Sequence, residues 1–141
     1  MIQQDLAKIL KLHARWLQED KGGQRANLRK ADLGQVILCG VNLEAADLRE
    51  VNLEGANLEG ANLRNADLRN ANLRNADLGD ADLYGANLQN ADLQNANLRD
   101  ANLQDANLQK VSMRGADLRG ARLWGCTLRG TKMTIGNKQK E

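Results

Sequence analysis

Leucine recurs at every fifth position through most of this chain, a spacing that neither an ordinary helix nor a flat sheet can bury. From position 26 to position 135 the sequence divides into 22 consecutive pentapeptides without an insertion. The third residue is Leu in 20 units and Met in two, and the first residue is always Ala, Val, Cys or Thr. The second residue is Asn or Asp in 17 units. Such regularity indicates one structural unit used repeatedly.

The period of five excludes the two common ways of burying leucines. On an α-helix five residues turn about 500°, so successive leucines would lie about 140° apart and form no apolar stripe. On a flat strand an odd step sends alternate leucines to opposite faces, and Ala, Asn and Asp are poor strand formers. A backbone that bends once per unit instead directs every first and third residue toward one axis. The sequence therefore predicts a solenoid.

The composition fits a narrow interior with sharp corners. Aromatic residues make up 2% of the chain and Phe is absent, which leaves Leu and Ala to fill the axis. The first residue must be small because several side chains compete for the same narrow space. Asn and Asp at the second position, with Gly or Asn at the fifth, suit corners that need side-chain hydrogen bonds or a positive φ. Fifth-position glycines include Gly55, Gly60, Gly85, Gly115, Gly120, Gly125 and Gly130.

Units such as Ala61-Asn62-Leu63-Arg64-Asn65 and Ala91-Asp92-Leu93-Gln94-Asn95 follow the pattern A(D/N)LXX. From Ala26 to about Arg129, about three quarters of the chain, the sequence resembles the pentapeptide-repeat proteins, a family abundant in cyanobacteria. The resemblance implies an all-β solenoid, a right-handed quadrilateral β-helix with four pentapeptides per coil. Twenty-two units would then make about 5.5 coils, a rod about 26 Å long at about 4.8 Å per coil.

These patterns divide the chain into three parts. We expect an N-terminal capping helix and linker over residues 1–25, a pentapeptide-repeat β-helix over 26–135 and a polar C-terminal tail over 136–141. The pattern weakens near both ends of the repeat, as is typical of terminal repeats. The second position holds Ile37 near the start, and Arg122, Thr127 and Lys132 near the finish. Whether residues 131–135 stay in the coil is left open.

The N-terminal segment has the pattern of a lid for the first coil. An open solenoid end would expose apolar side chains and unpaired backbone. One stripe at helical spacing consists of Leu6, Ile9, Leu10, His13, Trp16 and Leu17. We predict a short capping helix over about residues 3–19, stopped by Gly22 and Gly23. A membrane-surface or partner-binding helix is the alternative. The polar tail is too short to cap the other end, and we expect a monomer rather than an end-to-end dimer.

The sequence gives little support for a catalytic site, a metal site or a disulfide. A filled rod offers outer faces and no cavity, so we predict no enzyme, no catalytic residues and no cofactor. No His or Cys cluster predicts a metal site, and a calcium site at Asp80 and Asp82 has no recognised spacing behind it. His13 is interpreted as a cap residue. Cys126 takes an inward position and Cys39 an outward one almost five coils away, which excludes a disulfide between them.

We expect the protein in the cytoplasm, because charged residues interrupt the N-terminal apolar pattern and leave no signal-peptide core. No stretch approaches a membrane span, so a membrane partner is not expected.

With 20 residues per coil, fourth-position residues should stack in columns on the outside. One column holds Arg29, Arg49, Arg69, Gln89, Gln109 and Arg129 and contains no acid, so it either meets an anionic partner or is a solvated face. A second column holds Glu44, Arg64, Tyr84, Gln104 and Trp124. Tyr84 and Trp124 would lie about 10 Å apart. Because exposed Tyr and Trp often anchor interfaces, we predict that this pair binds a protein partner.

The leading hypothesis is a rigid, non-enzymatic module that displays side chains to another protein of unknown identity. The family resemblance implies an alternative, because some members imitate the shape and charge of DNA and inhibit DNA gyrase. Residues 26–135 carry 13 basic and 14 acidic residues, and the whole chain has a formal charge of +2. A DNA mimic needs one sign of charge along its length, so the balance argues against mimicry, and it also argues against a nucleic-acid partner.

Overall fold

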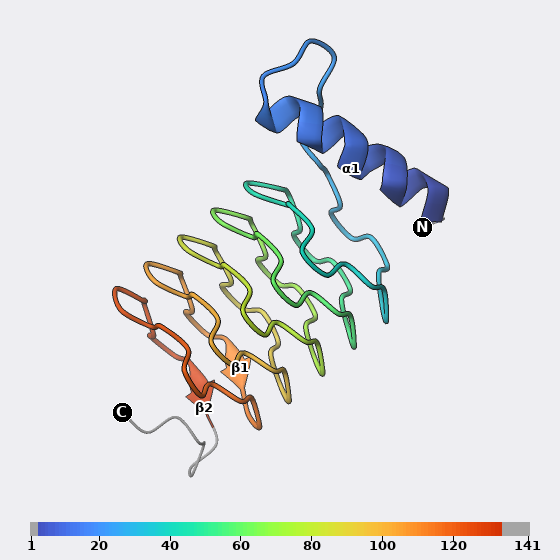
Figure 1. Ribbon diagram of the computed structural model, residues 1–141. Coiled ribbons are helices and arrows are strands. Elements are labelled where there is room, and N and C mark those ends of the chain that lie inside the picture. The colour runs from blue at the N-terminus through green and yellow to red at the C-terminus, as the bar shows by residue number, and fades with distance from the viewer. Residues whose placement is uncertain (1–2, 134–141) are drawn as a thin grey trace.

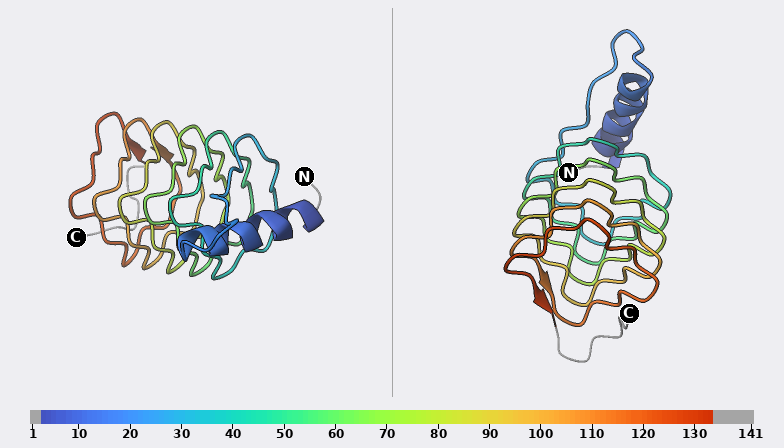
Figure 2. Two further views of the ribbon diagram at one scale, coloured as in Figure 1. Left: turned by 90° about the horizontal axis from the view of Figure 1, so that it is seen from above. Right: turned by 90° about the vertical axis from the view of Figure 1, so that its left-hand side faces the viewer.

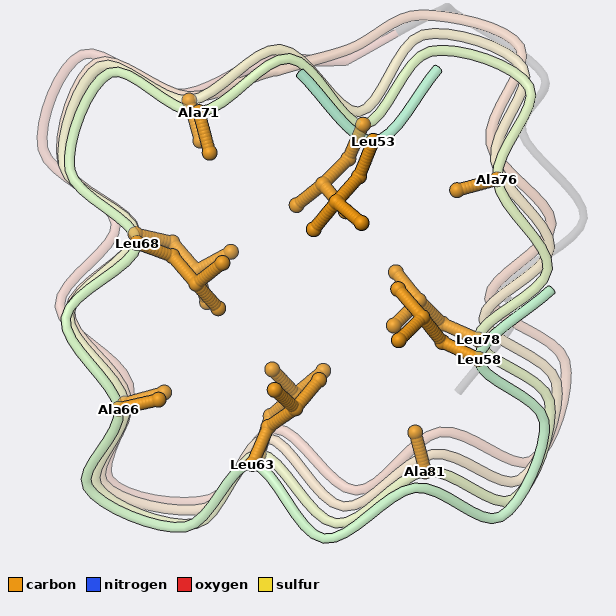
Figure 3. Packing of buried hydrophobic residues seen from close by; sticks show 14 of the residues in the cluster. Leu53, Leu58, Leu63, Ala66, Leu68, Ala71, Ala76, Leu78 and Ala81 are labelled. Carbon is orange, nitrogen blue, oxygen red and sulfur yellow. The ribbon is translucent and has the colours of Figure 1, made fainter. Parts of the chain in front are cut away.

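The computed structural model describes residues 3–133, which form one helix followed by a stack of coils (Figure 1). Helix α1 spans Gln3–Leu17, and two short strands, β1 (Ser112–Met113) and β2 (Lys132–Met133), pair in parallel. Isolated parallel bridges join the second residue of a unit to the residue 20 positions later, from Asn27 with Asp47 to Asn107 with Thr127. Each coil therefore contains four pentapeptides. Viewed along the axis, the coils have a four-sided outline (Figure 3).

Three backbone hydrogen bonds per unit hold neighbouring coils together. The third residue donates to the second residue of the next coil, as in Leu68 N–H to the Asn87 carbonyl at 2.7 Å. The fifth residue donates to the fourth residue of the next coil, and the second residue donates back to the first residue of the preceding coil. The stack thus satisfies most main-chain groups that a period of five would otherwise leave unpaired.

A tight turn forms every corner. The first residue of a unit donates to the third residue of the unit before it, as in Ala71 N–H to the Leu68 carbonyl at 3.0 Å. The fifth residue has a positive φ in all 21 units where the structure describes it, eight of them Gly and 13 of them not. A turn of this kind needs positive φ at its third residue, which favours Gly and Asn. The predicted use of positive φ at the fifth position is confirmed.

The core is a continuous column of leucine and small side chains. Third-position leucines and first-position alanines point inward from all four sides (Figure 3), and those between residues 43 and 108 are buried. The last coil differs because nothing among the described residues stacks on it. Its inward residues Leu128 and Met133 are 47% and 40% exposed. Residues 131–133 remain in the coil through β2, whereas positions 134–135 and the predicted tail lie outside the described residues.

Helix α1 lies across the first coil, at the end of the stack away from β2 (Figures 1 and 2). Of the predicted capping stripe, Leu6 and His13 are buried, and Ile9 and Leu10 pack half-buried against the core. Leu17 is also half-buried. Trp16 is less covered than a capping residue should be, at 37% exposed, and its ring stacks on that of His13 at 5.5 Å. No helix among residues 3–133 combines the length and the apolar character of a membrane span.

The predicted end of this helix is wrong by two residues and in its cause. The helix ends at Leu17, where Glu19 N–H donates to the Trp16 carbonyl and Asp20 N–H to the Arg15 carbonyl. With Glu19 at φ 58°, this is the paired hydrogen bonding of a Schellman motif. Gly23 has a different role, because a Cβ there would lie 2.3 Å from the Trp16 nitrogen. It lets the linker pass close against the helix end.

His13 joins the helix to the first coil. Its Nδ1 accepts a hydrogen bond from Ala26 N–H at 2.9 Å, so the neutral ring carries its proton on Nε2. Nε2 is buried and has no hydrogen-bond partner within residues 3–133. Burial lowers the pKa of His13, the main chain of Glu44 partly offsets it, and the charge of Arg25 lowers the pKa further. Protonation would place an N–H on Nδ1, facing the Ala26 N–H.

We therefore expect the free energy of unfolding to fall in mild acid. The pKa of His13 is lower in the folded protein than in the unfolded chain, so the unfolded chain binds the proton more readily. The stabilisation by neutral His13 is complete above about pH 6.5, the pKa of the unfolded chain, and it is lost as the pH falls through the lowered pKa of the folded protein. We expect a loss of about 1 kcal/mol from the broken hydrogen bond. Thermal unfolding followed between about pH 7 and pH 5 measures it.

The variant His13→Leu is the control, because His13 is the chain's one histidine and no other side chain has an ordinary pKa in this range. The stability of the variant should change much less across the same interval. An equal pH dependence in both proteins would rule out His13 as its source.

Candidate functional site

The predicted aromatic column exists as one face of the stack, but its two aromatic residues differ. Bridges from Asn62 to Asp82 and on to Asn102 and Arg122 align the units that carry Arg64, Tyr84, Gln104 and Trp124. Glu44 begins the same column, one coil before Arg64. The column therefore runs along the outside of the rod to the last coil.

Tyr84 is held by its neighbours, whereas Trp124 projects. The Arg64 guanidinium carbon lies 4.6 Å from the centroid of the Tyr84 ring, and Arg64 Nη1 lies 3.0 Å from Asp82 Oδ2. The carboxylate of Asp105 raises the pKa of the Tyr84 phenol by hydrogen bonding. Tyr84 is half-buried in this arrangement, while Trp124 is 75% exposed. Among the predicted surface residues, Trp124 is thus the one with a large apolar surface available.

The predicted arginine column is largely neutralised. Arg49 binds Asp47 through two hydrogen bonds of 2.8 and 2.6 Å, Arg69 binds Asp67 in the same way, and Arg29 lies 3.1 Å from Glu50. The hydrogen bonds from Arg49 lower the pKa of Asp47 to about 2. Because each of these three arginines is paired with a carboxylate, the column is better interpreted here as a solvated face than as a binding site for an anionic partner. Arg129, in the last coil, is exposed.

The predicted hydrogen bonds between second-position side chains and nearby backbone are confirmed, but sequence reasoning missed the bonds that these side chains form along each column. The second residue's Oδ1 accepts the N–H of the fourth residue of its own unit, as Asn62 does from Arg64 at 3.0 Å. Asn amides also donate along a column, for example Asn97 Nδ2 to Asp77 Oδ1 at 2.9 Å. Asp47 and Asp67 are stacked carboxylates that cannot share such a bond, and each pairs with its own arginine. The sequence signal for these ion pairs is the run Asp-Leu-Arg, which places the carboxylate and the guanidinium two residues apart.

The remaining reactive side chains are separate from one another. Cys39 is exposed and Cys126 half-buried, and both are free thiols. Cys126 Sγ donates to the Leu103 carbonyl at 2.8 Å, and burial raises the pKa of its thiol. Within residues 3–133, no three His, Cys, Asp or Glu side chains lie close enough to hold a metal ion. Hollows of about 400 and 300 Å³ border α1, next to Ile37 and to Trp16.

Comparisons with known proteins agree with the repeat pattern. The family model, described as pentapeptide repeats (8 copies), matches three overlapping ranges, residues 26–65, 61–100 and 96–134. No curated protein matches the chain. Among solved structures, HetL of the cyanobacterium Nostoc sp. strain PCC 7120, a pentapeptide repeat protein involved in heterocyst differentiation regulation, is 36% identical with a TM-score of 0.66. The match covers 78% of this chain and 60% of HetL, so the chain spans less than two thirds of that protein.

Two further cyanobacterial pentapeptide repeat proteins match over nearly their whole length. Alr5209 of Nostoc PCC 7120 is 34% identical, with 91% of this chain and 94% of alr5209 covered and a TM-score of 0.39. Rfr23 of Cyanothece 51142 is 30% identical, with 88% and 98% covered and a TM-score of 0.42. The family model covers well over half of the residues, in the frame that the leucines define. The chain belongs to the pentapeptide repeat family.

Proposed function

We propose that this protein is a non-enzymatic interaction module, a right-handed quadrilateral β-helix of about 5.5 coils that binds another protein through the column ending at Trp124. The observation that carries the proposal is the 75% exposure of the Trp124 side chain. A solvent-exposed indole leaves a large apolar area in water, and Trp is among the residues that most often dominate binding energy at interfaces.

The rest of the column supports a rigid binding face. Each coil is bonded to its neighbours on all four sides, so side chains in the column are held at a fixed spacing. Arg64, Asp82 and Asp105 fix the Tyr84 ring, which reduces the conformational entropy lost when a partner packs against it. HetL, a related protein, is involved in regulating a differentiation process. A regulatory binding role is the corresponding proposal for this chain.

Mimicry of DNA is the weaker candidate. Mimicry requires one sign of charge along the rod, whereas residues 34–113 carry a net charge of −6 and residues 114–133 a net charge of +4.

The variant Trp124→Ala tests the proposal. Partners captured from a cyanobacterial lysate by the immobilised protein should bind the variant on the order of tenfold more weakly, because an anchor residue is lost. Gln104→Ala, one coil away in the same column, is the matched control and should retain them. If Trp124→Ala and Tyr84→Ala both leave every captured partner unchanged, the column is not the binding surface.

A further inference from the structure

The last described coil has a large excess of basic over acidic side chains, unlike the coils before it. Residues 114–133 contain five basic side chains against one acidic side chain, a net charge of +4, the basic ones being Arg114, Arg119, Arg122, Arg129 and Lys132. The four preceding coils, residues 34–113, contain six basic and twelve acidic side chains, a net charge of −6. The five basic residues come from all four sides of the coil, so they surround its open end.

This end also carries unused main-chain donors. In every earlier coil the third and fifth residues donate their N–H groups toward the C-terminal side of the stack, as Gly85 does to the Gln104 carbonyl at 2.9 Å. Six N–H groups at the same positions of the last coil point the same way but find no acceptor among residues 3–133. These donors are the N–H groups of Leu118, Gly120, Leu123, Gly125, Leu128 and Gly130.

Apolar side chains fill the space inside the ring of basic residues. Leu128 and Met133, which would be buried in any earlier coil, are 47% and 40% exposed, and Leu123 is half-buried. Trp124 stands at the rim, 75% exposed. The end face therefore combines an apolar centre, a row of hydrogen-bond donors and a positively charged border.

We propose that this end face binds an extended, acidic segment of a partner protein, which adds to the last coil as the next rung of the ladder. The partner's carbonyl groups would accept the six N–H donors, alternate apolar side chains would cover Leu128 and Met133, and carboxylates would face the basic ring. The inference rests on the proposed function, and it defines the chemistry of the partner beside Trp124.

Charge decides between this occupant and a second copy of the chain. Two copies meeting by their last coils would bring two charges of +4 together, and like charges across an interface are costly. A nucleic acid is also less suitable, because its phosphates would meet the charges but would not follow the peptide ladder or cover the leucines. The basic residues encircle one coil, whereas a nucleic acid track would run along several.

Amide NMR of the isotope-labelled protein tests the proposal with the glycines as reporters. The probe is a peptide of three Val-Glu-Val-Glu-Gly units, about 15 residues, which is long enough to pair in register with the backbone from Leu118 to Gly130 and to turn at each corner as a coil does. We expect the amide signals of Gly120, Gly125 and Gly130 to shift and their hydrogen exchange to slow on binding. Gly55, Gly60 and Gly85, which already donate at 2.8–2.9 Å, are internal controls and should not change. The same peptide with lysine in place of glutamate should not bind.

The charge requirement is tested with matched variants. The double substitution Arg122→Gln with Arg129→Gln removes two charges from the ring and should weaken peptide binding on the order of tenfold at low salt. Lys8→Gln with Lys11→Gln removes the same charge from exposed positions on α1 and should leave binding unchanged. Added salt should weaken binding by the native protein more than by the ring variant.

Three results would overturn the inference. The first is no shift of the three glycine signals at millimolar peptide, which would leave the Trp124 capture result, and hence the proposed function, standing. The second is an equal or larger response to a single-stranded oligonucleotide. The third is a concentration-dependent dimer that moves the same glycine signals without peptide. Shifts that occur normally in Trp124→Ala would instead separate the end face from the proposed aromatic anchor.

Discussion

The substitution Leu68→Ala is expected to lower the free energy of unfolding by about 3–5 kcal/mol, the range for a fully buried leucine in a core that cannot collapse. Leu68 is 0% exposed and points into the axis beside Ala66 and Ala71 (Figure 3). Its backbone is bonded to the coil on its C-terminal side, which holds the walls of the resulting cavity apart. Chemical denaturation of the purified protein measures the loss.

Leu128→Ala is the matched control for this prediction. Leu128 occupies the same column and the same third position, three coils later, but is 47% exposed. Its removal deletes the same atoms, yet much of their surface is already in water, so we expect a loss below about 1.5 kcal/mol. Equal losses at the two sites would show that Leu68 is not in a closed core.

The interior and the corners could be predicted from the sequence because each unit repeats the same local demand. A leucine at every fifth residue leaves few backbones able to bury it, and the small first residue shows how narrow the axis is. The ladder imposes the corner conformation even where the residue disfavours it: Lys30 and Ala45 adopt φ 60°, which non-glycine residues other than Asn and Asp rarely do. Here the stacking of coils overrides local preference.

The ion pairs between side chains were harder to predict, because a long arginine side chain can contact several different carboxylates. Arg49 and Arg69 were expected to form a basic column, but each turns back to the aspartate two residues earlier. The position of a residue in a column determines where its Cα and Cβ lie, but it does not determine where the guanidinium group of a long arginine side chain lies. Helix α1 gives a second example, because it ends at a left-handed Glu19 and not at Gly22 and Gly23, the predicted stop.

The charge of the last coil could not be predicted from the total charge of the repeat. Residues 26–135 nearly balance, while the distribution along the axis does not. In a solenoid each coil contacts only its neighbours, so local composition matters more than the total.

The substitution Ala66→Leu is expected to lower the free energy of unfolding by about 1–3 kcal/mol, although it adds apolar surface to the core. Ala66 is 1% exposed and lies between Leu63 and Leu68 (Figure 3). The parallel bridges place Ala46 and Ala86 in the coils on either side. Three extra carbons would have to displace these leucines or separate the coils, and separation breaks the hydrogen bonds of the ladder. The loss would appear as a lower denaturation midpoint.

Ala121→Leu tests whether the cost comes from confinement at a first position. Ala121 also holds a first position, in the last coil and in the column next to that of Ala66, where it is half-buried and the added carbons can turn toward the open end. We expect a change within about 0.5 kcal/mol of zero, the usual range for substitutions outside a packed core. If Ala66→Leu were as mild as Ala121→Leu, the axis would be wide enough for leucine at every inward position, and the alternation of small and large residues would need a different explanation from packing.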